Sequence, residues 1–424
     1  MLRNYLLTAW KVFMRRKLFT AINLTCIVLT LVVLLVVTAL LQQAFFPAGV
    51  EGRSPRFLQV LMMESRHSAH PDVRRGPLGY KLIDKYLKPL AALPGVEAVA
   101  AVTLPVGVTV YQQGRTSDLL MRRADAEYWK ILDFKLLAGR VPDAADVDQG
   151  RFVAVLNASS ARRLFPASAT AAADGSNAAL GQKINAGGQW FSVIGVVEDV
   201  LHLNALADIW VPLTTFPSSD YRGQLAGNFS ALLMARSAAE LPALQRAVER
   251  AAATVQFDDP TQWNIASFWA DSKLDLFARM LLQSQGADSG AATLLAVIVT
   301  LMLLFMLLPA LNLVNLNSGR ILERSAEIGV RKAFGATSAQ LVWQLVLENV
   351  LLCLAGGLLG LLGARAVLSW LEASALVPYL HVELNLAVFG YGLLLTLVFG
   401  LLSGVLPAWK MSRLDPVHAL KGTV

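Results

Sequence analysis

One short stretch of the chain brings together side chains that can bind metal ions. Residues 64–72 read ESRHSAHPD and contain Glu64, His67, His70 and Asp72. Imidazole and carboxylate groups are common ligands of zinc and related ions. However, an H-x-x-H spacing in a polar stretch with a proline is a weak signal, and a solvated loop explains it better. We therefore predict no metal site in this stretch.

The residue sets that other chemistries require are missing from the sequence. It contains no HExxH or GxSxG motif, no cysteine–histidine set, and no GxxxxGK[ST] phosphate loop. The two cysteines, Cys26 and Cys353, both lie within apolar runs, so we expect neither a disulfide nor a zinc site. The sequence thus predicts a protein that is not an enzyme, with no catalytic residues and no directly bound cofactor.

A charged stretch between two long apolar runs offers a different chemistry, the binding of another protein. Residues 323–341 read ERSAEIGVRKAFGATSAQL. Glu327 precedes Arg331 by one helical turn, which is the favourable order for an ion pair, and Gly335 suits a helix C-cap. The residues that follow fit a capping box at the start of the next helix. We expect a short helix here, and its spacing leaves open whether it only turns the chain or docks on a partner.

The elements around this stretch have the composition of membrane spans. Hydrophobic residues make up 55% of the chain and charged residues 16%. A bilayer core needs about 20 apolar helical residues, and four segments meet that length. These segments are residues 18–42, 291–316, 341–371 and 386–408. The first is too long for the apolar core of a signal peptide. Residues 1–17, which lead into it, resemble an amphipathic helix at the membrane surface.

Basic residues indicate how these spans are oriented. Lysine and arginine gather at the N-terminus, in residues 317–340 and in the tail 409–424, whereas the loop 372–385 has none. Basic loops stay on the cytoplasmic side, so both termini are expected there and residues 43–290 outside. The expected location is the inner (plasma) membrane, in contact with lipids. The net charge of +7 does not indicate nucleic-acid binding, because no basic face interleaved with aromatic residues is visible.

The segment 43–290 has a mixed pattern of strands and helices. The strand patterns RFLQVLMME (56–64) and NFSALLMAR (228–236) each precede a helical pattern, 78–93 and 238–255, and a further strand candidate follows each helix. Short β patterns fill the residues between, about 105–225, and an alanine- and glycine-rich loop is expected there at 166–180. The predicted fold is therefore four transmembrane α-helices with a large α+β extracytoplasmic domain between helices 1 and 2. That domain would comprise a split βαβ/βαβ, porter-like part and an inserted β-rich subdomain.

Glycines four residues apart in the spans predict close helix packing. Gly356 and Gly360 lie in the third span, and Gly400 and Gly404 lie in the fourth. Small residues at this spacing let two helix backbones approach each other. Packing within one chain is slightly favoured over a seam between two copies.

Several separate stretches resemble one family of transport proteins. The stretch 323–341 resembles the signature of the FtsX-like permease family of ABC transporters. Residues 134–146, 153–166 and 180–200 are similar to the periplasmic domain of MacB-type permeases, and 400–422 is similar to the end of the family's last span. The resemblance extends over essentially the whole chain in the same order.

The resemblance implies a four-span permease subunit that pairs with a second copy or a related permease above a separate cytoplasmic ATPase. That ATPase would use ATP and Mg²⁺, and the permease would transmit its movement to the extracytoplasmic domain to export or release a drug, a peptide or a lipid-like molecule. A periplasmic adaptor and an outer-membrane channel are further partners that it suggests. The residues implied to contact the ATPase are Glu323, Glu327, Ile328, Gly329, Arg331, Lys332, Gly335 and Thr337.

This sequence departs from the family pattern in one important respect. MacB carries its ATPase on the same chain, whereas no phosphate loop is present here. Two other roles remain open from the sequence, a lipoprotein-release permease and an FtsX-like regulator of an external cell-wall enzyme.

Overall fold

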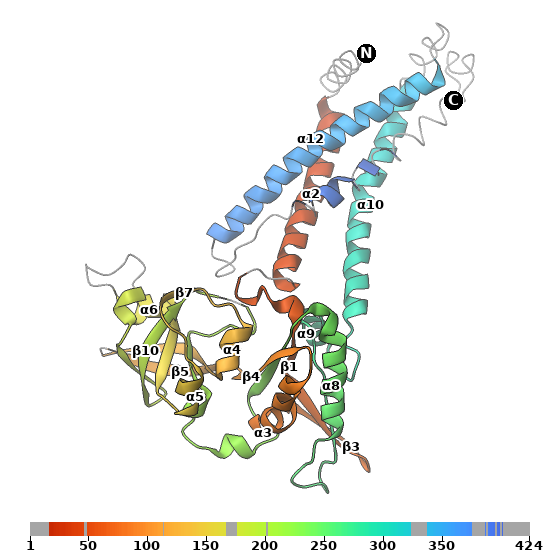
Figure 1. Ribbon diagram of the computed structural model, residues 1–424. Helices are drawn as coiled ribbons and strands as arrows, with labels where there is room; N and C mark the ends of the chain where they lie inside the picture. Colours follow the sequence, from red (N-terminus) through yellow and green to blue (C-terminus); the bar gives the residue numbers. More distant parts are fainter. Residues whose placement is uncertain are drawn as a thin grey trace. The chain divides into compact units, whose positions relative to one another are not determined.

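The computed structural model describes most of the chain and divides it into two compact units (Figure 1). One unit comprises Met1–Gln42 and Leu295–Val424, and the other comprises Gln43–Leu294. The described residues are 17–45, 49–112, 114–166, 176–200, 202–323, 337–374, 386, 389–394, 397–398 and 401. Each unit is considered by itself below.

Three long helices form the described part of the first unit. They are α2 (Lys17–Phe45), α10 (Ala291–Glu323), whose first residues belong to the second unit, and α12 (Ser338–Ala373). Among the described residues, Thr20–Gln42 and Val346–Ala373 are long and apolar enough to cross a membrane, and Ala291–Phe305 is a shorter apolar segment. The predicted spans 18–42, 291–316 and 341–371 lie within these helices. The predicted fourth span is described only in part, and the predicted helix at 1–17 lies almost wholly outside the described residues.

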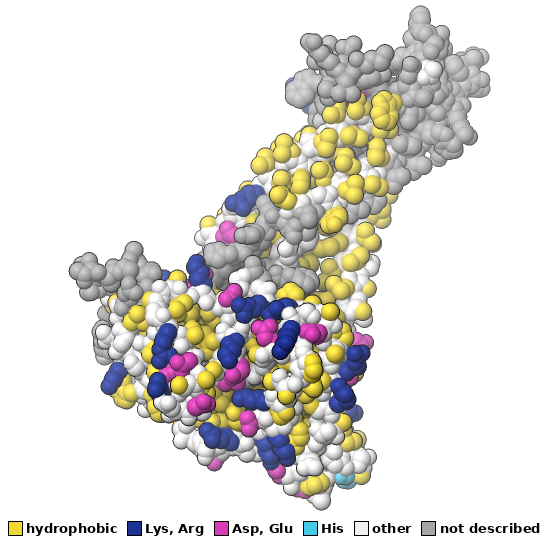
Figure 2. Space-filling model, in the orientation of Figure 1, with side chains coloured by type: hydrophobic (Ala, Val, Ile, Leu, Met, Phe, Trp, Pro, Cys, Tyr) yellow, Lys and Arg dark blue, Asp and Glu magenta, His cyan; other side chains and the backbone are white. Residues whose placement is uncertain are grey.

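The surface of these helices differs from that of the second unit. Figure 2 shows hydrophobic side chains over most of the described helical surface, whereas lysine, arginine, aspartate and glutamate gather on the domain. Many large apolar side chains of α10 are exposed, including Leu301, Leu304 and Leu311. Apolar side chains on the outer surface are what a helix presents to lipid, because the surrounding acyl chains are equally apolar.

The second unit contains a split arrangement of four strands. They are β1 (Phe57–Val60), β4 (Val96–Thr103), β12 (Phe229–Ala235) and β13 (Ile265–Phe268). β12 lies between β1 and β4 and is antiparallel to both. Just beyond β13, Asp271 exchanges two backbone hydrogen bonds of 2.8 Å with Gln59 of β1. Each parallel strand pair, β1 with β4 and β12 with the β13 segment, therefore has another strand between its members.

Helical segments connect the members of each pair. The second connection is the regular helix α8 (Leu241–Ala253), which follows η7 (Ala238–Glu240). The first was predicted as one helix over 78–93, but it is irregular: α3 (Tyr80–Leu82), a π turn η3 (Ile83–Leu87) and a 3-10 segment η4 (Lys88–Ala92). Pro89 has no backbone N–H to donate, so regular α-helical bonding cannot continue through it. Both connections contribute to one core that includes Leu82, Leu87, Leu233 and Val248.

The predicted strand 56–64 is in fact two strands. After β1 the chain passes Leu61 and enters β2 (Met62–His67), which pairs with β13 and with β3 (His70–Pro77) in a separate three-stranded sheet. The stretch 64–72, expected to be a solvated loop, is therefore part of a β-hairpin. The strand β3 is mostly exposed, since only its last two residues are partly buried.

The β-rich part closes into a barrel. Its strands are β5 (Val106–Gln112), β6 (Arg115–Ala124), β8 (Val153–Asn157), β9 (Lys183–Ala186), β10 (Gln189–Val197) and β11 (Ile209–Pro212). They pair in the order β6, β11, β8, β10, β9 and β5, and β5 pairs again with β6. β7 (Leu136–Gly139) adds to β10. The interior is filled by side chains such as Val110, Ile184 and Phe191.

Short helices surround this barrel. They are α4 (Ala126–Ile131), α5 (Ala144–Asp148), α6 (Ala158–Leu164) and α7 (Ser176–Ala179), with the 3-10 turns η1 (Gly49–Glu51), η2 (Ser54–Arg56), η5 (Leu213–Thr215) and η6 (Asp220–Gly223). The predicted flexible loop 166–180 thus ends in a helix, α7, and residues 167–175 of it lie outside the described part. Tyr128 and Trp210 lie fully buried in a further core cluster between barrel and split sheet.

Candidate functional site

Two charged side chains that are far apart in the sequence meet in the interior of the second unit. Glu51 lies in η1, shortly after α2 ends, and its side chain is fully buried. Lys273 begins helix α9 (Lys273–Leu282), and its Nζ donates to Oε2 of Glu51 at 2.5 Å. The backbone N–H of Asn204 donates to the other carboxylate oxygen at 3.0 Å. Both oxygens of the buried carboxylate therefore have partners, which offsets its loss of hydration.

A second set of contacts holds the chain between α9 and α10. Arg279 of α9 binds Asp271 through two hydrogen bonds of 2.8 and 3.0 Å. It also donates to the carbonyl of Gly286 at 2.7 Å. The hydroxyl of Ser289 donates to the carboxylate of Asp275 at 2.6 Å. The segment that enters α10 is therefore folded back along α9.

We call these six side chains the root cluster: Glu51, Asp271, Lys273, Asp275, Arg279 and Ser289. The cluster joins the chain that has just left α2 to the chain that is about to enter α10. It consists of ion pairs and hydrogen bonds and includes no nucleophile paired with a base. Such an arrangement suits the mechanical connection of two chain segments rather than a chemical reaction.

Burial changes the titration of two groups at this location. It raises the pKa of Asp271 above its ordinary value, although the ion pair with Arg279 opposes this change. It lowers the pKa of His202, whose ring nitrogens are both buried without a hydrogen-bond partner. The imidazole is therefore neutral at pH 7, and the charges of Glu51 and Lys273 balance each other.

The residues implied to contact an ATPase lie between α10 and α12. Glu323 is the last residue of α10, and Thr337 directly precedes α12. The other six lie outside the described residues: Glu327, Ile328, Gly329, Arg331, Lys332 and Gly335. The structure thus describes the two long helices that any movement of this stretch would reach first.

The glycines of the third predicted span face α2. A Cβ at Gly356 would lie 2.5 Å from Cγ2 of Ile27, and one at Gly360 would lie 2.9 Å from Cβ of Leu31. Ile27 and Leu31 also form a buried cluster with Leu352 and Cys353 of α12. The two helices therefore pack within the chain, and glycine permits their close approach. Gly400 and Gly404 of the predicted fourth span lie outside the described residues.

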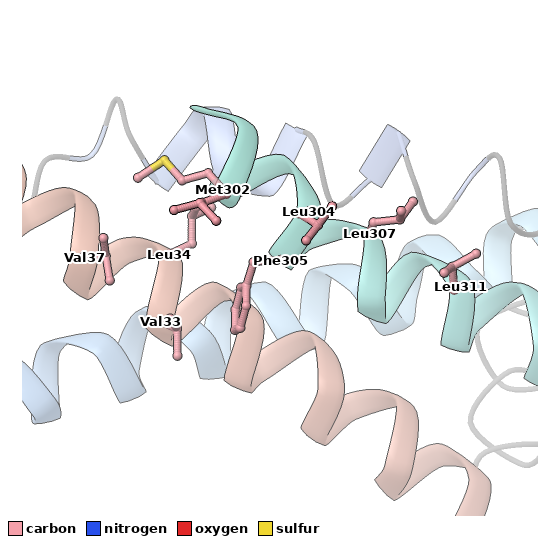
Figure 3. Close-up of a pocket in the computed structure, with 9 residues that line it drawn as sticks. Val33, Leu34, Val37, Met302, Leu304, Phe305, Leu307 and Leu311 are labelled. Atoms are coloured by element: carbon pink, nitrogen blue, oxygen red, sulfur yellow. The ribbon is translucent and has the colours of Figure 1, made fainter. Parts of the chain in front are cut away.

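An apolar groove of about 430 Å³ lies between α2 and α10. Figure 3 shows side chains of both helices along it. The lining residues are Val33, Leu34, Val37, Leu301, Met302, Leu304, Phe305, Leu307 and Leu311. No charged side chain lines this groove, so its described walls match acyl chains or other apolar groups.

The candidate metal ligands are placed on the β2–β3 hairpin. The rings of His67 and His70 stack with centroids 5.0 Å apart. Glu64 is mostly buried and accepts a hydrogen bond of 2.7 Å from Arg75. Within the described part of the chain, no three histidine, cysteine or carboxylate side chains are grouped as metal ligands would be.

Comparison with known families accounts for both units. The model of the MacB-like periplasmic core domain matches residues 20–251, and that of the FtsX-like permease C-terminal domain matches residues 299–416. This pair of domains defines a membrane permease of the ABC transporter class with an extracytoplasmic domain. The chain belongs to the FtsX-like, MacB-type family of these permeases.

Individual relatives differ in how much of their length the chain spans. An uncharacterized ABC transporter permease, YknZ of Bacillus subtilis (strain 168), is 27% identical over 346 residues, which are 79% of this chain and 78% of YknZ. The macrolide export ATP-binding/permease protein MacB of Salmonella typhimurium is 26% identical over 297 residues, 69% of this chain but only 42% of MacB. The solved periplasmic region of MacB from Actinobacillus actinomycetemcomitans is 17% identical, with a TM-score of 0.38 over 56% of this chain and 96% of its own.

Proposed function

We propose that the chain is the transmembrane subunit of an ABC transporter that couples ATP hydrolysis by a separate ATPase subunit to events outside the membrane. The observation that carries this proposal is the order of the two matched domains, a MacB-like periplasmic core followed by an FtsX-like permease domain, on a chain without a phosphate loop. ATP and Mg²⁺ would be bound by the partner, since a phosphate needs the backbone cradle of such a loop.

The proposed mechanism is mechanical transmission. The stretch 323–337 receives the movement of the ATPase and passes it to α10 and α12. Because Gly356 and Gly360 pack against α2, movement of α12 also loads α2. The root cluster ties the chain segments next to α2 and α10 together, so it would convert their displacement into movement of the domain.

The proposed substrate is a drug, a peptide or a lipid-like molecule, which the complex exports or releases outside the membrane. The macrolide export named for the MacB relatives supports this substrate class. The proposed topology has four spans in the inner membrane, both termini in the cytoplasm and a second permease copy or a related permease beside it. A periplasmic adaptor and an outer-membrane channel would complete a tripartite efflux assembly.

A substitution in the stretch 323–337 tests this function. In Gly329→Trp, the indole blocks close approach of the ATPase, whereas insertion in the membrane needs only the apolar spans. We expect the variant to insert and to remain folded but to lose co-purification with the ATPase and transport in cells. The reversed pair Glu327→Lys with Arg331→Glu should do the same, because charges of the same sign would then meet on the partner.

Arg250→Glu, on the exposed side of α8, is the matched control and should retain the ATPase and transport. If Gly329→Trp binds the ATPase and transports as the unaltered protein does, residues 323–337 only turn the chain and the proposed coupling is wrong.

A further inference from the structure

Helix α9 carries an exposed apolar surface at its C-terminal end. Met280, Leu281 and Leu282 are 59%, 60% and 41% exposed. The other side of the same helix is buried, as Leu276 and Ala278 show. Three consecutive large apolar side chains in water are unfavourable, and such a surface usually marks a place where a protein meets another apolar medium.

The chain after α9 returns to this surface before it enters α10. The Ser289–Asp275 and Arg279–Gly286 hydrogen bonds hold the returning segment along the helix. At Gly290, a Cβ would lie 2.8 Å from Cδ1 of Leu282 and 2.7 Å from Oγ of Ser284. The residue directly before α10 therefore contacts the last residue of α9.

The apolar part of α10 begins at its first residue. The segment Ala291–Phe305 is apolar throughout, and the predicted span 291–316 starts at the same place. One helical residue rises about 1.5 Å, so the first turn of α10 lies within a few ångströms of the depth at which the chain enters the bilayer. Since Leu282 contacts Gly290, the apolar surface of α9 lies at that depth too.

The polar neighbours of this surface are those of a membrane interface. The guanidinium of Arg279 lies 5.1 Å from the centre of the Trp269 ring. Tryptophan and arginine both favour the interfacial region, where an apolar body and a polar group find matching surroundings. The root cluster joins α9 to the rest of the domain, so attachment of α9 would fix the orientation of the whole unit.

We propose that Met280, Leu281 and Leu282 insert into the outer interface of the lipid bilayer and anchor the extracytoplasmic domain there. The occupant of this surface is lipid, because the chain continues from it directly into a membrane span. The assignment to the outer leaflet rests on the proposed function, which places the domain outside the cell. Binding of this kind is reversible and scales with the apolar area buried.

Lipid-borne quenchers test the proposal in the full-length protein. Cys26 and Cys353 are replaced by alanine, Leu281→Cys is labelled with bimane, and the protein is placed in phosphatidylcholine–phosphatidylglycerol nanodiscs with a nitroxide near the headgroup. We expect the bimane to lose most of its emission. The control is Tyr111→Cys on barrel strand β5, where the native side chain is 56% exposed, and it should keep its emission. Equal emission at both positions would overturn the proposal.

Two further measurements distinguish lipid contact from subunit contact and one side of the membrane from the other. Cross-linking of Leu281→Cys to a second copy, together with unquenched emission, would assign the surface to an interface between subunits and overturn the proposal. In sealed vesicles, an impermeant thiol reagent identifies the side of the membrane on which position 281 lies. Quenching with access only from the cytoplasmic side would retain lipid contact but overturn both the outer-leaflet assignment and the proposed topology. Because quenching needs no ATPase, Gly329→Trp should leave it unchanged.

Discussion

Asp146 is a buried carboxylate that stays ionised because arginines surround it. Arg140 contacts both of its oxygens, and Arg151 donates to one of them at 3.1 Å. The backbone N–H of Asp143 donates to it as well, within the capping box that begins α5. The hydrogen bond from Arg140 is the largest cause that lowers the pKa of Asp146 to about 2. The ion pairs therefore fix the loop between β7 and α5 on the barrel.

Asp146→Asn should lower the stability of the domain in a way that depends on pH. The folded-state pKa of about 2 lies below the ordinary value of 3.8, so ionisation stabilises the fold above pH 3.8, and this contribution is lost as the pH falls toward 2. We expect a loss of about 1–3 kcal/mol at pH 7, from charge-assisted hydrogen bonds to half-exposed arginines. Urea unfolding of the full chain in detergent at pH 7 and pH 3 measures it.

The control for this prediction is Asp148→Asn, an exposed residue of the same helix, which should change stability little at either pH. An Asp146→Asn variant as stable as the unaltered protein at pH 7 would contradict the role assigned to these ion pairs.

The sequence identified the candidate coupling residues but not the root cluster. The stretch 323–341 is continuous, so its charges and glycines can be compared directly with a family signature. Glu51 and Lys273 are 222 positions apart, and no local spacing links them. Only the pairing of β1 with residues far along the chain brings these two side chains together. Hydrophobic patterns specify such contacts indirectly, through the fold.

At the level of elements, the contact between α2 and α12 depends on glycine. Four glycines of α12 lie under side chains of other helical segments; Gly356, Gly360 and Gly363 face Ile27, Leu31 and Val32 of α2, and Gly357 faces Leu393. At Gly360 the nearest atom is the Cβ of Leu31, which cannot move aside by a simple rotation. Close helix packing therefore has little tolerance at this position.

Gly360→Leu should separate α2 from α12. The added side chain would overlap Leu31, and overpacking of this kind costs about 1–3 kcal/mol. We expect a lower midpoint of thermal unfolding in detergent and weaker transport, because movement of α12 would no longer load α2. Gly390→Leu is the control, since no described atom lies within 4 Å of a Cβ placed at Gly390. Equal unfolding midpoints for the two variants would contradict the packing role of Gly360.

Strand and helix patterns predicted the two βαβ connections but not how the barrel closes. The patterns at 56–64, 228–236 and 238–255 correspond to β1 with β2, β12 and α8. β5 and β7 were not predicted, because β5 is mostly exposed or half-exposed and β7 has only four residues. Closure requires β5 to pair with both β6 and β9. Which edges join in a sheet is decided by register and twist, and these leave little trace in a single sequence.

At the scale of the whole molecule, the proposed topology gives a direct prediction. In a protein whose native cysteines are replaced, Ala145→Cys on the exposed surface of α5 should react with an impermeant reagent from outside intact cells. His418→Cys, in the basic tail, should react only after the membrane is opened. Mass shifts of the labelled protein on gels measure both reactions. Labelling of position 418 in intact cells would rule out a cytoplasmic C-terminus.

The pairing of β1 has a consequence for how the protein is made. β1 is entirely buried, and its neighbour in the main sheet, β12, pairs Phe57 with Met234. Synthesis at roughly 5–20 residues per second means that β1 emerges about 10–35 s before that neighbour exists. During this interval its apolar side chains and backbone donors are unpaired on the far side of the membrane. A chain arrested before residue 231 could not form the split sheet, and it would remain a substrate for proteases until translation resumed.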